Sequence, residues 1–342
     1  IALSWIYLAY GDVPLVAGIF YGIKPAVAAI VLQAAHRIGN RALKNKVLWA
    51  IAGASFVAIF ALNVPFPAIV AAAALVGYVG GRIAPETFRA GGGHGQGSKS
   101  FGPALIDDDS PRLPHTCFAW QRLIKVLLAG LALWLVPMLW LWVNYGWNHT
   151  LTQMSWFFTK AAWLTFGGAY AVLPYVYQGA VSHFGWLSAP QMIDGLALGE
   201  TTPGPLIMVV AFVGFVGGYA KALFGPDSLF LAGAVAATLV TWFTFLPSFI
   251  FILAGGPLVE STHNELRFTG PLTAITGAVV GVILNLALFF GYHVLWPQGF
   301  GGTFDFLSGM IMLAAALALF RFKIGVMPVI AGCAAIGLIL RF

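Results

Sequence analysis

The chain has 342 residues, of which 60% are apolar and only 8% are charged, and its mean hydropathy is +0.90. A soluble domain carries roughly 25% charged residues, so these polar groups are too few to cover a water-exposed surface. The composition therefore predicts an integral membrane protein. The net charge of +6 does not indicate nucleic-acid binding, because the basic residues concentrate in loops where membrane topology explains them.

Long apolar segments separated by short polar loops predict an all-α, polytopic membrane protein rather than a β-barrel. The first segment begins at Ile1 without a basic leader, and we interpret this start as a truncation inside a membrane helix. Two distant cysteines, Cys117 and Cys333, disfavour a disulfide framework and a thiolate metal site. The apolar segments lie near residues 1–9, 18–38, 47–63, 65–84, 123–146, 154–178, 190–223, 228–254, 271–296, 304–320 and 324–340.

Residues 85–120 differ abruptly from the rest of the chain, because they are rich in Gly, Ser, Pro and charged residues. Such a composition is typical of a flexible linker. It separates two halves with related sequences. Residues 25–33 align with 277–285 at an offset of 252, which places Gln33 opposite Asn285, and residues 67–69 align with 328–330 at an offset of 261.

These matches predict a duplication. We assign 1–84 to the C-terminal part of a first transmembrane repeat, 85–120 to a cytoplasmic linker and 121–342 to a second transmembrane repeat. The first repeat is expected to be incomplete.

The charges predict that the repeats are inverted. In the first half, four basic residues lie between 37 and 46, whereas the turn at 63–67 has none. In the second half the matching turn contains Arg321 and Lys323, whereas the preceding loop, 296–303, has no basic residue. Because basic loops stay in the cytoplasm, equivalent hairpins would insert in opposite directions, as they do in many transporters.

Two helices are predicted to be interrupted at membrane depth, one at Phe166-Gly167-Gly168 with Pro174, the other at Thr201-Thr202-Pro203-Gly204-Pro205. In lipid such breaks are tolerated only where the freed backbone faces protein or a wet cavity. A half-helix that starts near Pro205 would direct its N–H groups at an anion. We therefore predict an anion site that includes Gly167, Gly168, Gly204 and Pro205. Kinks that only help the helices to pack are the alternative.

Several side chains could complete this site. A lysine in mid-span is costly unless it is paired or functional, so Lys160 is expected either to supply positive charge or to snorkel to an interface. Glu200 could couple a proton, pair with Lys160 or lie exposed at a helix end. Asp194 is expected at an interface. The other candidates are hydroxyl donors, and amides that either line the site or join helices: Thr165, Thr201, Thr202, Gln33 and Asn285.

The sequence FGGAYAVLP at 166–174, followed by ETTPGP at 200–205, resembles the CHR chromate transporter family in its long, two-repeat form. Residues 22–33 and 41–45 resemble the end of that family's first repeat. The resemblance implies a secondary transporter that exports chromate across the bacterial inner membrane and confers chromate resistance, with sulfate as a similar oxyanion. The composition and spacing by themselves indicate only a membrane cavity that suits an anion.

Other functions remain open, namely import or exchange of sulfate or another small anion, a membrane-embedded enzyme, or a structural role. The sequence has no nucleotide-binding loop, serine-hydrolase, zinc-protease or haem motif. We therefore expect no catalytic residue, no cofactor and no metal. The expected partners are chromate or sulfate and the lipid bilayer, with no nucleic acid, and a homo-oligomer is left open.

Overall fold

The computed structural model describes residues 1–11, 13–88, 119–165, 169–202, 204–261 and 269–341. These residues form helices joined by turns, without a strand. Within these described residues, five helices are long and apolar enough to cross a membrane, which confirms the all-α, polytopic class. The helices are α1 (Ala2–Tyr10), α2 (Pro14–Ala42), α3 (Lys46–Phe60), α4 (Phe66–Ile83), α5 (Pro85–Phe88), α6 (Trp120–Tyr145), α7 (Thr150–Trp163), α8 (Ala169–Tyr177), α9 (Ala189–Thr201), α10 (Val209–Ala220), α11 (Leu229–Ser261), α12 (Thr269–Leu295), α13 (Phe306–Phe320) and α14 (Val326–Arg341), with short helical turns η1 (Gln178–His183), η2 (Leu206–Met208) and η3 (Pro226–Ser228).

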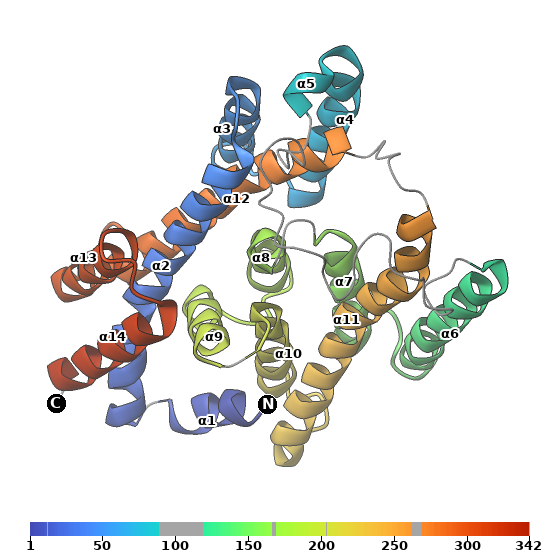
Figure 1. Ribbon diagram of the computed structural model, residues 1–342. Coiled ribbons are helices and arrows are strands. Elements are labelled where there is room, and N and C mark those ends of the chain that lie inside the picture. The colour runs from blue at the N-terminus through green and yellow to red at the C-terminus, as the bar shows by residue number, and fades with distance from the viewer. Residues whose placement is uncertain (12, 89–118, 166–168, 203, 262–268, 342) are drawn as a thin grey trace, which may run out of the picture.

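Helices α2 and α12 pack against each other, and each carries the hairpin of the other half. The α13–α14 hairpin packs on α2, and the α3–α4 hairpin packs on α12 (Figure 1). The six helices are therefore interlocked, and we call them the scaffold.

Glycines permit the closest helix crossings in the scaffold. A Cβ atom placed on Gly337 of α14 would lie 2.5 Å from the carbonyl oxygen of Gly18 on α2. A Cβ on Gly270 of α12 would lie 2.5 Å from the carbonyl oxygen of Gly77 on α4. The two crossings correspond, because Gly18 and Gly270 are 252 residues apart, the offset found in the sequence.

The two scaffold hairpins also match each other in detail. Helices α3 and α13 both have 15 residues, and each begins after a side-chain cap. Asn45 Oδ1 accepts a hydrogen bond from the Leu48 N–H at 3.0 Å, and Asp305 Oδ1 accepts one from the Ser308 N–H at 2.9 Å. The two caps are 260 residues apart.

The turns inside the two scaffold hairpins also correspond at an offset of 260 residues. Asn63 and Lys323 both have positive φ, 50° and 53°. The N–H of the residue after each bonds to the carbonyl of Ala58 or Ala318, at 3.0 Å in both hairpins. The alignment of 67–69 with 328–330 is thus wrong by one residue, because the backbone geometry fixes the offset of this hairpin at 260.

The segments 154–178 and 190–223, each predicted as one interrupted helix, are each a pair of antiparallel helices. In the first pair the ring of Phe157 on α7 stacks on Tyr175 of α8 at 4.7 Å and lies over Gly179. Residues 18 apart in a continuous helix would be separated by about 27 Å. The chain therefore reverses between α7 and α8.

The second pair reverses in the same way. Gly199 near the end of α9 faces Leu206 and Val209, and Gly195, one turn earlier, lies under the ring of Phe212 on α10. These contacts centre on the predicted break at 201–205. The break is confirmed at its described flanks, since α9 ends at Thr201 and the turn η2 begins at Leu206.

Counted with the adjoining turns η1 and η2, the four arms of these pairs have 13–15 residues and reach about 20–23 Å, less than the ~30 Å of a bilayer core. We therefore interpret both pairs as re-entrant hairpins and call the described residues beside their reversals, 164–165 and 202–205 without 203, their tips. Both enter from the same side, because Gly217 near the end of α10 packs against Met154 near the start of α7 and against Trp186 between the hairpins.

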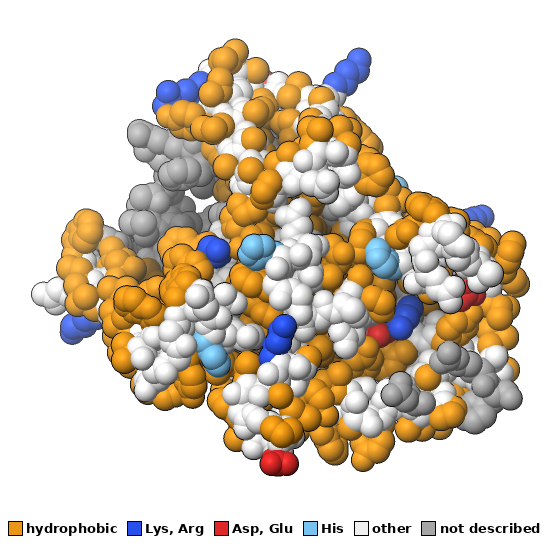
Figure 2. Space-filling view, turned by 180° about the vertical axis from the view of Figure 1, so that it is seen from behind, with side chains coloured by type: hydrophobic (Ala, Val, Ile, Leu, Met, Phe, Trp, Pro, Cys, Tyr) orange, Lys and Arg blue, Asp and Glu red, His pale blue; other side chains and the backbone are white. Residues whose placement is uncertain are grey.

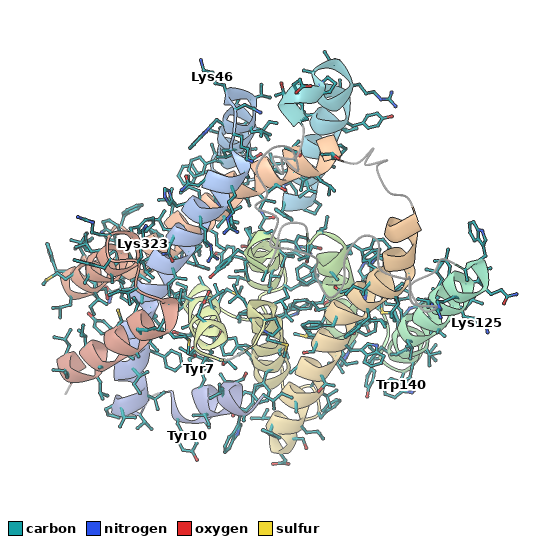
Figure 3. The ribbon with its side chains drawn as sticks, viewed as in Figure 1. Tyr7, Tyr10, Lys46, Lys125, Trp140 and Lys323 are labelled. Carbon is teal, nitrogen blue, oxygen red and sulfur yellow. The ribbon has the colours of Figure 1, made fainter. Side chains whose placement is uncertain are left out.

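The basic residues indicate which side this is. They gather at the C-terminal end of α2, in the turn around Lys323 and at the start of α6, where Figure 3 shows Lys125 and Trp140 toward opposite ends of the helix. Elsewhere charged side chains are scattered on a mainly apolar surface (Figure 2). The positive-inside rule predicts that the hairpins enter from outside and that their tips point toward the cytoplasm. Lys221, at the base of the second hairpin, is an exception to this distribution.

Candidate functional site

The structure brings the tips of the two re-entrant hairpins together. Tyr170, in the first turn of α8, donates a hydrogen bond from its hydroxyl to Glu200, near the end of α9. Helix α8 also contacts the turn η2. Residues beside two interruptions that are distant in the sequence thus form one polar centre.

Arg37 adds positive charge to this centre. It lies on α2, near the end that we place in the cytoplasm, and its guanidinium interacts electrostatically with both Glu200 and Tyr170. Glu200 is partly buried, so the prediction of an exposed carboxylate at a helix end is wrong. Its hydrogen-bond partner is Tyr170 rather than Lys160.

The predicted hydroxyl donors lie beside the tips, but their protons are directed to backbone carbonyls. Thr165 Oγ1 donates to Ala161 O at 2.7 Å, and Thr201 and Thr202 donate to Leu198 O at 3.0 and 2.6 Å. These bonds satisfy carbonyls at the ends of α7 and α9. A hydroxyl has one proton, so each would have to rotate before it could donate to an anion.

The second tip has an open backbone. Gly204 has φ +149°, which side chains disfavour, and a Cβ there would meet no atom within 4 Å. Pro205 precedes the turn η2 and leads into α10. The tip therefore presents the N-terminal end of a half-helix, the positive end of its dipole. The predicted Gly167 and Gly168 lie outside the described residues.

Lys160 has a different environment. Its side chain is exposed, with Nζ 5.7 Å from the centre of the Trp156 ring. It borders a groove of about 890 Å³ between α6, α7 and α11, whose other lining residues are mainly Leu, Trp, Ile and Phe. This position favours the interpretation that Lys160 snorkels along an apolar surface, and its role in the anion site stays a prediction.

Gln33 and Asn285 occupy equivalent sequence positions but lie in different surroundings. Gln33 Nε2 donates to Leu319 O on α13 at 3.2 Å and so joins two scaffold helices. Asn285 lines a pocket of about 630 Å³ with polar groups that include Asn63 and Gln178. Interhelical bonding thus accounts for Gln33, whereas Asn285 faces a cavity.

Asp194 is not at an interface as predicted but is 3% exposed. Its carboxylate is 3.2 Å from Lys24 Nζ on α2 and accepts a hydrogen bond from the Tyr7 hydroxyl on α1 at 2.8 Å. Tyr7 is labelled in Figure 3. The network links the second re-entrant hairpin to the scaffold.

The sequence interpretation missed Arg37, Tyr170 and Lys24. Lys24 could have been found, because it is a lysine in an apolar span and meets the criterion that singled out Lys160. Arg37 has no such signal, since near a helix end it is indistinguishable from a topology-setting charge. Tyr170 stands within the quoted motif, but only the folded chain places it opposite Glu200.

Comparison with known proteins connects this architecture to a family. The family profile described as chromate transporter matches residues 1–78 and 152–338. The chain is 34% identical over 285 residues to a chromate transport protein of Pseudomonas aeruginosa, covering 82% of this chain and 58% of that protein. It is 24% identical over 346 residues to a chromate transport protein of Cupriavidus metallidurans, covering 99% of this chain and 71% of that protein.

A probable chromate transport protein of Synechococcus elongatus is 25% identical over 323 residues, covering 92% of this chain and 67% of that protein. The chain thus spans between 58% and 71% of the length of these relatives. No solved structure matches it significantly. Because the profile matches most of the chain, including segments of both halves, this chain belongs to the chromate transporter family.

Proposed function

We propose that this protein is a secondary transporter that exports chromate, a tetrahedral dianion, across the bacterial inner membrane. The observation that carries the proposal is the meeting of two re-entrant tips within the membrane, joined by Tyr170 and Glu200. Family membership supplies the substrate class. Membrane carriers commonly bind substrate where helices are discontinuous near mid-membrane.

The tips suit an oxyanion for electrostatic reasons. The N-terminal ends of α8 and of η2–α10, which are the positive ends of their dipoles, lie at the tips, where α8 contacts η2. A partly buried helix terminus stabilises an anion by up to about 2 kcal/mol. Gly204 lets the anion approach the backbone closely, and Arg37 offsets the negative charge of Glu200.

Membrane voltage favours the export direction. An inside-negative potential drives a negative charge outward by about 2.3 kcal/mol per 100 mV, or roughly 4.6 kcal/mol for a dianion. Export can run on this energy without a coupled ion, whereas import cannot.

Alternating access requires one body to move against another. Because α13–α14 packs on α2 and α3–α4 packs on α12, the two proposed repeats cannot rock as separate rigid bodies. The matched caps, turns and glycine crossings support the duplication. We therefore assign the movement to the re-entrant hairpins against the scaffold.

Uptake of labelled chromate by everted membrane vesicles tests the proposal. We expect uptake above that of vesicles lacking the protein, driven by an interior-positive potential and reduced by excess sulfate. Uptake of sulfate but not chromate would show that the substrate is sulfate rather than chromate. The absence of uptake of either anion, in vesicles shown to hold a potential, would overturn the proposal.

A further inference from the structure

The ion pair between Lys24 and Asp194 lies far from both ends of a membrane-spanning helix. Lys24 is the eleventh residue of the 29-residue α2, about 15 Å from its start. The Asp194 side chain is 4% exposed, whereas that of Lys24 is 32% exposed. The carboxylate is thus enclosed by protein, and the ammonium group keeps room for a second ligand.

Asp194 and Lys24 use different shares of their hydrogen-bonding capacity. Asp194 has two partners, Lys24 and the hydroxyl of Tyr7. An ammonium group has three donors, of which the ion pair engages one. The next residue, Pro25, has no backbone N–H to continue the helix bonding. Because Asp194 also accepts a hydrogen bond from Tyr7, it keeps one partner if Lys24 turns to another anion.

Such a pair is costly as a purely structural device. Removing two charges from water costs several kcal/mol per ion, and well-packed apolar residues of similar volume often stabilise a protein as well or better. An intramembrane charge is accordingly a candidate for function. The pair also joins the scaffold to the second hairpin, across the boundary at which the proposed function places movement.

The geometry points to Lys24 as a cation that binds the transported oxyanion by exchanging its Asp194 carboxylate partner for it. This inference rests on the proposed function and adds a binding residue to it. A tetrahedral oxyanion such as chromate or sulfate offers acceptor oxygens to the free ammonium donors. Asp194 stays hydrogen-bonded to Tyr7, so the exchange breaks the ion pair between α9 and α2 when the anion is bound.

Charge-neutral variants distinguish this exchange from a structural salt bridge. In a structural bridge, Lys24→Gln leaves a buried unpaired carboxylate, and the double variant K24Q/D194N removes that penalty and restores function. If Lys24 binds the oxyanion, the double variant folds but stays defective. We expect K24Q/D194N to bind chromate and sulfate at least tenfold more weakly than the unaltered protein.

Binding is measured by calorimetry on the purified protein, with unfolding temperature as the check of folding. Lys125→Gln removes an exposed charge from α6 and serves as the matched control. A folded double variant that binds either oxyanion as tightly as the unaltered protein would overturn the inference but leave the proposed function intact. If the unaltered protein binds neither anion, both proposals are wrong.

Discussion

Glu200 is the carboxylate that the two re-entrant tips share. It accepts a hydrogen bond from Tyr170 and is close enough to Arg37 for an electrostatic interaction. A carboxylate beside an anion site is repulsive unless it is neutralised. The contacts therefore suit a group that takes up a proton when the oxyanion binds.

Replacing Glu200 with Gln tests this role. Glutamine keeps an oxygen that accepts from Tyr170 but cannot titrate, so we expect uptake by everted vesicles to lose its dependence on pH. The matched control is Glu86→Gln, a carboxylate on the short helix α5 away from the tips. A Glu200→Gln variant with unchanged rate and pH dependence would exclude proton coupling by this residue.

Residue types in the sequence predict where the candidate site lies, but not how its members pair. Glycine and proline identify both tips, because their effect on a helix is local. The partners of Glu200 and Asp194 come from α8, α2 and α1, which are distant in the sequence. No periodicity encodes such contacts, so the sequence does not predict the burial of Asp194 or its pairing with Lys24.

At the scale of elements, the main difference between prediction and structure is the reversal of the interrupted helices. The length of an apolar run of 25–34 residues predicts one membrane span, whether the chain continues as a helix or reverses within the run. The reversal depends on packing between its halves, such as Phe157 on Tyr175 and Phe212 over Gly195. Those contacts join residues on either side of the break, so the hydropathy profile does not reveal them.

The glycine crossings of the scaffold are expected to be sensitive to added volume. Gly337→Ala would place a methyl group against the backbone of Gly18 and Gly22. Overpacking of this kind costs about 1–3 kcal/mol, so the unfolding temperature in detergent should fall. Gly332→Ala is the control in the same helix, because its Cβ would meet no atom within 4 Å. Equal unfolding temperatures for the two variants would contradict the close approach of α14 to α2 at Gly337.

At the scale of the whole molecule, the scaffold combines two similar hairpins, which we predict to insert in opposite directions. Their lengths, caps and turns match at an offset of 260 residues. The sequence predicts the duplication and the inversion, and its alignment of these hairpins is off by one residue. It does not predict that each hairpin packs on the central helix of the other half, because such contacts join residues that are distant in the sequence.

Single cysteines test the inversion. Leu62 and Phe322 are equivalent turn residues and are 69% and 71% exposed. With Cys117→Ser as background and Cys333 buried, a membrane-impermeant maleimide should label Leu62→Cys in intact cells. It should label Phe322→Cys only in everted vesicles. Labelling of both from the same side would disprove the inverted arrangement.

The central claim, that the tips of the re-entrant hairpins hold the oxyanion, is tested most directly at Gly204. Both Gly204 and Gly225 have positive φ, +149° and +90°, with space for a side chain, but Gly225 lies beyond the base of the second hairpin. The measurement is chromate uptake by everted vesicles that contain equal amounts of each valine variant. We predict that Gly204→Val abolishes uptake and that Gly225→Val, which also replaces a glycine of positive φ, retains most of it. Uptake by Gly204→Val at the rate of the unaltered protein would contradict the account.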